Sequence, residues 1–135
     1  MSVFSATYRV SFGDCDPAGI VFYPNLFAWL DRTFHSFLAE NAGGHAALCA
    51  QLDAKGIGLT DAACSFRAPV TEGDALTIAI TAISWDSRTF TLAYEGLVDG
   101  KPHFKGSETR ALFIQGDGRL KAGDLSGLRS ILSAD

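Results

Sequence analysis

Two carboxylates stand close together in a short segment that disfavours regular structure. Asp14 and Asp16 lie in the run GDCDPAG, directly before a long segment of helical periodicity. The first turn of a helix has unpaired backbone N–H groups and a partial positive charge. Here these are the N–H groups around Val21 to Tyr23, and they would stabilise an oxyanion if a carbonyl lay over them. A nearby carboxylate, Asp16, can attack that carbonyl or activate a water molecule, so the pattern suits acyl transfer.

The same aspartates also have a structural explanation. Aspartates before helices commonly cap the helix or form turns, and taken alone the local features favour this role. Asp14, which follows Gly13 directly, is the clearer turn former. Cys15 is not a good nucleophile candidate, because the negative charges on both sides raise the pKa of its thiol.

The segments around this loop predict one strand and one long helix. Residues 4–12 alternate between apolar and polar side chains, which predicts a strand with one buried face that includes Phe12. From about Pro24 to Asn41 the apolar residues recur every three or four positions, which predicts an amphipathic helix of about five turns. Pro24 suits the first turn, and Gly43-Gly44 ends the helix.

The rest of the chain alternates strands and turns. A shorter helix is expected at 45–55 and another at 125–132 behind Asp124. The expected strands are 59–70, 75–85, 89–98 and 103–115. Short turns predict that these four strands are antiparallel neighbours in chain order. The long helix, roughly 27 Å, can cover one face of the sheet. The sequence thus predicts an α+β fold in which a five-stranded antiparallel sheet wraps around one helix.

Composition excludes several classes of function. The chain has 135 residues, 47% hydrophobic and 19% charged, and a net charge of −4. A single domain over residues 1–135 is expected, and the acidic balance argues against nucleic-acid binding. Neither a membrane span nor a signal peptide is predicted. Three cysteines without metal-ligand spacing indicate reduced thiols, a cytoplasmic location and no metal site. The open edges of the sheet predict a homo-oligomer, most simply a dimer joined edge to edge.

The run VSFGDCDPAGIVFYPNLFAWLD, residues 10–31, resembles the active-site segment of the 4-hydroxybenzoyl-CoA thioesterase family. A looser match follows in SFRAP, residues 65–69, and in Gly73-Asp74, and the strand spacing matches to about Gln115. The resemblance implies the hot-dog fold and hydrolysis of an acyl-CoA, with an aromatic benzoyl-type group favoured. It implies no cofactor beyond the coenzyme A of the substrate. It also implies an active site between two subunits of a homodimer or tetramer.

The resemblance also assigns roles to single residues. Asp16 matches the catalytic carboxylate, and the Tyr23 N–H matches the donor that polarises the thioester carbonyl. Gly19 would let the substrate carbonyl come close to that N–H. Asp31 matches a carboxylate that faces the acyl group, but it is the weakest of these assignments, since the polar face of the helix beside Arg32 is the simpler explanation. Of the basic residues that pair with CoA phosphates in the family, only Arg88 is kept.

The sequence leaves the role of Asp16, the function and the acyl group open. Asp16 can act as the nucleophile or as a general base. Besides a thioesterase, a hydratase with the same fold is a second possible function, but such enzymes need a histidine beside the carboxylate and none stands near Asp16. A non-catalytic module that binds acyl-CoA or an acyl carrier is a third, and it predicts that Asp16 is dispensable. Leu26 stands where close relatives often have tyrosine, which leaves the acyl group undetermined.

Overall fold

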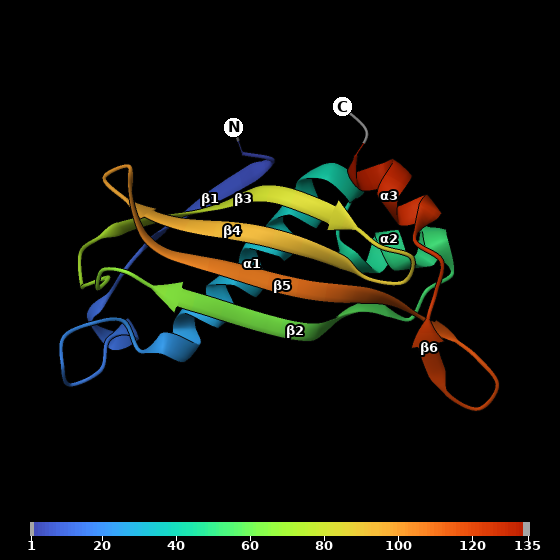
Figure 1. The fold of residues 1–135 in the computed structure, drawn as a ribbon, viewed down its shortest axis with the longest axis horizontal. Coiled ribbons are helices and arrows are strands. Elements are labelled where there is room, and N and C mark those ends of the chain that lie inside the picture. Colours follow the sequence, from blue (N-terminus) through green and yellow to red (C-terminus); the bar gives the residue numbers. More distant parts are fainter. Residues whose placement is uncertain (1, 134–135) are drawn as a thin grey trace.

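One curled antiparallel sheet wraps around helix α1 in the computed structural model, which describes residues 2–133 (Figure 1). Met1, Ala134 and Asp135, which belong to the predicted domain, lie outside the described residues. Two short helices cover one end of the sheet. The elements in chain order are β1 (Phe4–Arg9), η1 (Phe12–Asp14), α1 (Tyr23–Ala42), α2 (His45–Leu52), β2 (Gly56–Phe66), β3 (Ala75–Trp85), β4 (Phe90–Val98), β5 (Lys101–Gln115), β6 (Leu120–Ala122) and α3 (Ser126–Leu132).

The order of strands in the sheet is β1-β3-β4-β5-β2, and every pairing is antiparallel. The prediction that β2 and β3 are adjacent in the sheet is therefore wrong, because β2 pairs with β5 at the far edge. The connection from Arg67 to Asp74 crosses the end of the sheet instead of folding back as a hairpin. Within it, the Val70 carbonyl accepts the N–H of Val21 at 2.8 Å, and Thr71 forms a bridge with Ile20.

Helix α1 confirms the predicted long helix. It has Pro24 in its first turn and ends at Gly43, whose φ of 77° is the left-handed conformation that glycine adopts without strain. Its apolar stripe packs on the concave face of the sheet and forms most of the core. The buried side chains of this helix are Leu26, Leu30, Thr33, Phe34, Phe37 and Leu38.

The first strand is shorter than predicted. Strand β1 ends at Arg9, and Phe12, expected on the buried face, has 80% of its surface exposed. The cause is Asp14, whose Oδ2 accepts hydrogen bonds from the N–H and the hydroxyl of Ser11 at 2.9 and 3.1 Å. These bonds turn residues 12–14 into a 3-10 turn, so the alternation of the strand stops before Phe12.

Smaller differences lie at the ends of the elements. Strand β2 begins and ends a few residues earlier than predicted, α2 is shorter, and β6 was not predicted. Helix α3 begins at Ser126, one residue later than expected, and Asp124 accepts the Ser126 N–H at 3.1 Å. No helix among the described residues is long and apolar enough to cross a membrane.

Candidate active site

The loop between β1 and α1 folds back on itself as a short irregular hairpin. Cys15 pairs with Val21, and the Asp16 N–H donates to the Ile20 carbonyl at 2.9 Å. Gly19, with φ of 83°, makes the turn and donates its N–H to the Asp16 carbonyl at 2.9 Å. A Cβ at Gly19 would meet no atom within 4 Å, so the backbone conformation, and not lack of space, favours glycine there.

Only one N–H group of the predicted donor set is free. The Val21 N–H is bound by the Val70 carbonyl at 2.8 Å and the Phe22 N–H by the Asp14 carbonyl at 3.0 Å. Pro24 has no N–H, and the Asn25 N–H donates back to Phe22. Within residues 2–133 the Tyr23 N–H has no hydrogen-bond partner. Of the N–H groups that the sequence singled out, that of Tyr23 is therefore the one left free to bind a carbonyl oxygen.

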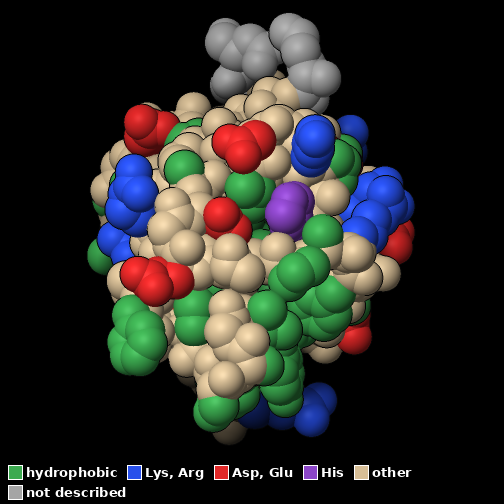
Figure 2. All heavy atoms as spheres, turned by 90° about the vertical axis from the view of Figure 1, so that its left-hand side faces the viewer, with side chains coloured by type: hydrophobic (Ala, Val, Ile, Leu, Met, Phe, Trp, Pro, Cys, Tyr) green, Lys and Arg blue, Asp and Glu red, His purple; other side chains and the backbone are tan. Residues whose placement is uncertain are grey.

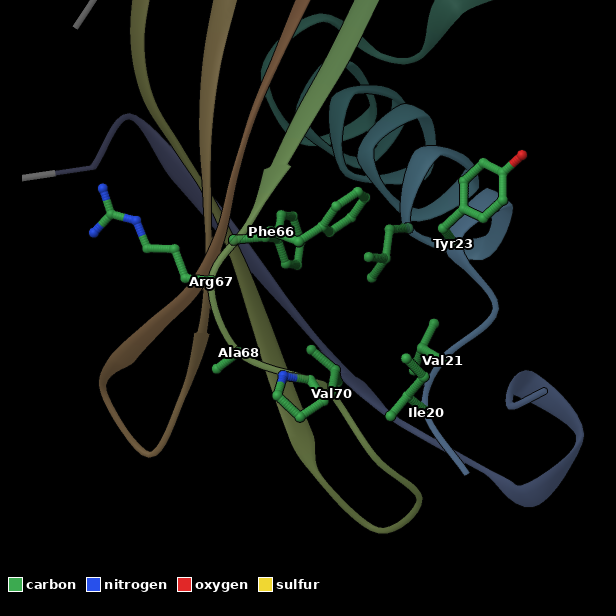
Figure 3. A pocket seen from close by; sticks show the side chains of 10 residues that line it. Ile20, Val21, Tyr23, Phe66, Arg67, Ala68 and Val70 are labelled. Carbon is green, nitrogen blue, oxygen red and sulfur yellow. The ribbon is translucent and has the colours of Figure 1, made fainter. Parts of the chain in front are cut away.

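An apolar cavity of about 370 Å³ opens beside this donor (Figure 3). Its walls come from the loop, from α1 and from the segment that follows β2. Phe66, Val21 and Val70 surround it, and the side chain of Arg67 points away from the other labelled residues. The lining residues are Ile20, Val21, Tyr23, Leu26, Phe66, Arg67, Ala68, Pro69, Val70 and Phe104. A cavity of this size and polarity suits part of a small organic ligand.

Asp16 lines a second cavity, of about 480 Å³, which shares no lining residue with the first. Its Oδ1 accepts the N–H of Ala18 at 2.9 Å, an Asx turn that fixes the carboxylate. Glu72 supplies a second carboxylate to the same cavity. The structure thus places Asp16 in the loop and Tyr23 at its end, where α1 begins, but within one chain they border different cavities.

The end of the molecule that carries both cavities is rich in exposed hydrophobic side chains. Figure 2 shows them gathered in the lower half of this end, below a group of charged side chains. Phe12 borders the cavity of Asp16, and Ile20, Tyr23 and Phe66 border the other cavity. Their exposed fractions are 80% for Phe12, 38% for Ile20, 59% for Tyr23 and 55% for Phe66. Exposed apolar groups at this density indicate a surface that binds a ligand or a second chain.

The Cys15 thiol is a poor candidate for the nucleophile in this loop. The pKa of the Cys15 thiol is raised by desolvation and by the charges of Asp14, Glu72 and Asp16, as the sequence predicted. The prediction that Asp14 forms a turn is also confirmed. Within residues 2–133 no three His, Cys, Asp or Glu side chains are grouped so that they could hold a metal ion.

Asp31 lies two turns beyond Tyr23 on α1, with 48% of its side chain exposed. Its Oδ1 accepts a 2.8 Å hydrogen bond from Nη2 of Arg110 on β5. Asp31 is thus neither a free surface residue nor part of the cavity beside Tyr23.

Arg110, and Glu108 on the same strand, were not singled out from the sequence. The sequence does carry a sign of their burial. Both residues stand an even number of positions from the apolar Phe104 and Leu112, so in a strand they point to the same face as these two. A charged pair at positions of the buried face points to an ion pair inside the fold.

Arg88 lies at the opposite end of the sheet from the loop. It belongs to the turn between β3 and β4, near α3 (Figure 1). Its positive charge contributes to lowering the pKa of Asp124, after the larger effect of the hydrogen bonds from Ser126. Within one chain the structure does not bring Arg88 to Asp16 or Tyr23.

Several known proteins that are similar to this chain are named as thioesterases. The family model described as the thioesterase-like superfamily matches residues 10–125. The 4-hydroxybenzoyl-CoA thioesterase of Pseudomonas sp. (strain CBS-3) is 50% identical over 32 residues, which span 24% of this chain and only 23% of that protein. The solved structure of that thioesterase superimposes with a TM-score of 0.81 at 25% identity, covering 95% of this chain and 96% of that one.

A second solved structure, a gentisyl-coenzyme A thioesterase, has a TM-score of 0.75 at 32% identity and covers 93% of this chain and 98% of that one. The hot-dog fold and the resemblance stated from residues 10–31 are thereby confirmed. Thioester hydrolysis, the activity predicted from the sequence, is that of both named relatives. The chain belongs to the thioesterase-like superfamily and has acyl-CoA thioesterases of aromatic substrates among its relatives.

Proposed function

We propose that this protein hydrolyses an aromatic acyl-CoA to the free acid and coenzyme A, with Asp16 and the Tyr23 N–H as its catalytic groups. The observation that carries the proposal is the free Tyr23 N–H at the start of α1, which borders an apolar cavity and lies at the end of the loop that holds Asp16. A carbonyl oxygen over that N–H would gain a hydrogen bond as negative charge develops on it.

The Asp16 carboxylate provides the second half of the reaction. Oδ1 is held by Ala18, so Oδ2 is the oxygen that can react. It either attacks the thioester carbon, forming a mixed anhydride that water then hydrolyses, or removes a proton from the attacking water. In both routes the C–S bond breaks, the thiolate of coenzyme A leaves and takes up a proton, and the acid is released. The reaction requires no cofactor besides the coenzyme A of the substrate.

Asp31 is proposed to bind the acyl group. Tyr23, Phe27 and Asp31 follow one another at four-residue spacing, so they lie along one side of α1. A hydroxylated aromatic group, the kind named for both relatives, carries a hydroxyl that could donate a hydrogen bond to the Asp31 carboxylate.

The complete site is proposed to need a second copy of the chain. Strand β2 is an unpaired edge of the sheet, and its residues Leu59 and Phe66 are 47% and 55% exposed. Two such edges pairing would cover these side chains and close the cavities that one chain leaves open. Gly19 is proposed to give the substrate access to the loop. Arg88, distant from the loop in its own chain, is proposed to contact CoA phosphates from another subunit.

The cellular location is proposed to be the cytoplasm. Cys15, Cys49 and Cys64 are all free thiols in the structure, which suits a reducing compartment.

Release of free thiol from a panel of acyl-CoA esters tests the proposal. The panel contains benzoyl-, 4-hydroxybenzoyl-, phenylacetyl- and hexanoyl-CoA, and binding of each ester is measured in parallel by calorimetry. We expect turnover of the aromatic esters and slower turnover of hexanoyl-CoA. Binding without thiol release from any ester would refute hydrolysis and support an acyl-CoA-binding module instead.

A further inference from the structure

A buried network of hydrogen-bonded charged and polar side chains connects the sheet to Asp31. Arg110, 2% exposed, lies between two carboxylates and donates from Nη2 to both of them, at 2.8 Å to Asp31 and 2.9 Å to Glu108. Its Nε also donates to Oε1 of Glu108 at 3.0 Å. The hydroxyl of Tyr94 donates to the same oxygen at 2.6 Å. The guanidinium carbon lies 4.2 Å from the centroid of the Phe34 ring, which packs against its flat face.

The buried end of this network is neutral, whereas its exposed end, at Asp31, carries a net negative charge. Arg110 and Glu108 form a neutral pair that is almost fully buried, with good hydrogen bonds between its members. Asp31 adds a second negative charge where the network reaches the surface of α1. Its Oδ1 is occupied by Arg110, and His35 approaches the same oxygen at 3.6 Å. Among the residues that the structure describes, Oδ2 of Asp31 has no hydrogen-bond partner.

We infer that Arg110 is a positioning residue, which fixes Asp31 so that Oδ2 is offered to a hydrogen-bond donor of the acyl group. Glu108 and Tyr94 hold the guanidinium in the plane that makes this possible. The inference rests on the proposed function, since it assumes that Asp31 faces the acyl group.

The geometry favours this role over simple stabilisation of the fold. Glu108 already compensates the charge of Arg110, so the buried pair does not require Asp31. A long surface side chain held by one bond would lose its orientation easily, whereas Asp31 is fixed by a guanidinium that is itself held by Glu108 and by the Phe34 ring. Because the single positive charge of Arg110 is shared between the carboxylates of Glu108 and Asp31, a net negative charge remains at the exposed carboxylate of Asp31. A neutral hydroxyl donor is therefore preferred there over an anionic substituent.

The test compares two substrates that differ by one hydroxyl group, benzoyl-CoA and 4-hydroxybenzoyl-CoA, in the variants Arg110→Gln and Asp31→Asn. We expect each variant to lower kcat/KM for 4-hydroxybenzoyl-CoA by about tenfold or more, mainly through KM. Benzoyl-CoA, which has no para donor, should change by less than about threefold. The double variant should lose no more than the larger single loss, because both changes remove the same interaction. Arg32→Gln, the same substitution at an exposed arginine of α1, is the matched control.

A second variant protects the test against misfolding of Arg110→Gln. Tyr94→Phe removes only the hydroxyl that donates to Glu108. It should reduce the preference for the hydroxylated ester, and this reduction should disappear in the Asp31→Asn background. Equal losses with both esters, or an unchanged preference in Asp31→Asn and Tyr94→Phe, would overturn the inference. Failure of the proposed function is recognised separately, because wild type would then hydrolyse neither ester.

Discussion

The side-chain amide of Asn25 donates a 2.8 Å hydrogen bond to the backbone carbonyl of Asp14, which also accepts the N–H of Phe22 at 3.0 Å. One carbonyl oxygen thus holds both the first turn of α1 and the residue before it against the loop. Since Phe22 directly precedes Tyr23, these bonds fix the direction of the free N–H that the proposed reaction uses.

Replacing Asn25 by alanine should therefore reduce activity more than stability. The change removes one part-buried hydrogen bond, which is worth about 1 kcal/mol. The Asp14 carbonyl keeps its bond to Phe22, so the fold is retained. We expect kcat to fall about tenfold or more as the Tyr23 N–H loses its fixed direction, while the unfolding midpoint falls by only a few degrees. Steady-state kinetics and thermal denaturation measure the two effects, and a fall in the midpoint without a loss of kcat would contradict this role.

Gly96→Ala should destabilise the core beside the cavity. Gly96 is buried on β4, and a Cβ there would overlap the ring of Phe104, which lines the cavity next to Tyr23. Forcing the ring aside costs about 1–3 kcal/mol. Gly13→Ala is the matched control, because its Cβ would meet no atom within 4 Å and its φ is not in the left-handed region. Chemical denaturation compares the two variants, and equal stabilities would show that the core adapts without cost.

Leu59→Glu should weaken association of the chain. Leu59 is 47% exposed on the edge strand β2, and a charge there would be buried in the proposed pairing of two edges. Leu120→Glu is the control, since Leu120 is 53% exposed but lies on β6. Sedimentation should show a dimer or larger assembly for wild type and the control. For Leu59→Glu it should show a shift towards monomer, with a parallel loss of thioesterase activity. A monomeric, active wild type would refute the shared site.

Stability should fall with increasing pH above about pH 9. Burial and the Glu108 charge raise the pKa of the Tyr94 hydroxyl far above its usual value and that of the Cys64 thiol to about 11. In the unfolded chain these groups ionise near their usual values, so unfolding releases protons and is favoured as pH rises. For Tyr94 the loss is up to about 1.4 kcal/mol per pH unit above pH 10. Chemical denaturation of wild type and Tyr94→Phe between pH 8 and 11 measures how the free energy of unfolding depends on pH. A parallel dependence in both proteins would contradict the assignment to Tyr94.

The sequence was most informative where local rules acted alone. The spacing of Leu30, Phe34 and Leu38 predicted α1 because helical periodicity needs only near neighbours. The role of Asp14 as a turn former followed from its position after Gly13. The motif in residues 10–31 led to the family, since it combined the loop with the start of the helix.

Relationships between distant segments could not be read in this way. The place of β2 beside β5 depends on how residues 67–74 pack against Ile20 and Val21, more than forty positions away. Phe12 follows the strand alternation, yet the bonds of Asp14 to Ser11 end the strand before it. The partnership of Asp31 with Arg110 joins residues 79 positions apart. Alternation placed Arg110 on the buried face, but nothing local identified its partner.

The most direct test of the central claim is the rate of thioester hydrolysis by Asp16→Asn, compared with Glu72→Gln. Both changes remove one carboxylate from the same cavity, so they separate a specific role of Asp16 from the general effect of charge. The account predicts that Asp16→Asn loses at least about 100-fold in kcat while still binding the ester, and that Glu72→Gln stays near wild type. Retained turnover in Asp16→Asn, or a collapse in Glu72→Gln instead, would contradict the assignment of Asp16 as the catalytic carboxylate.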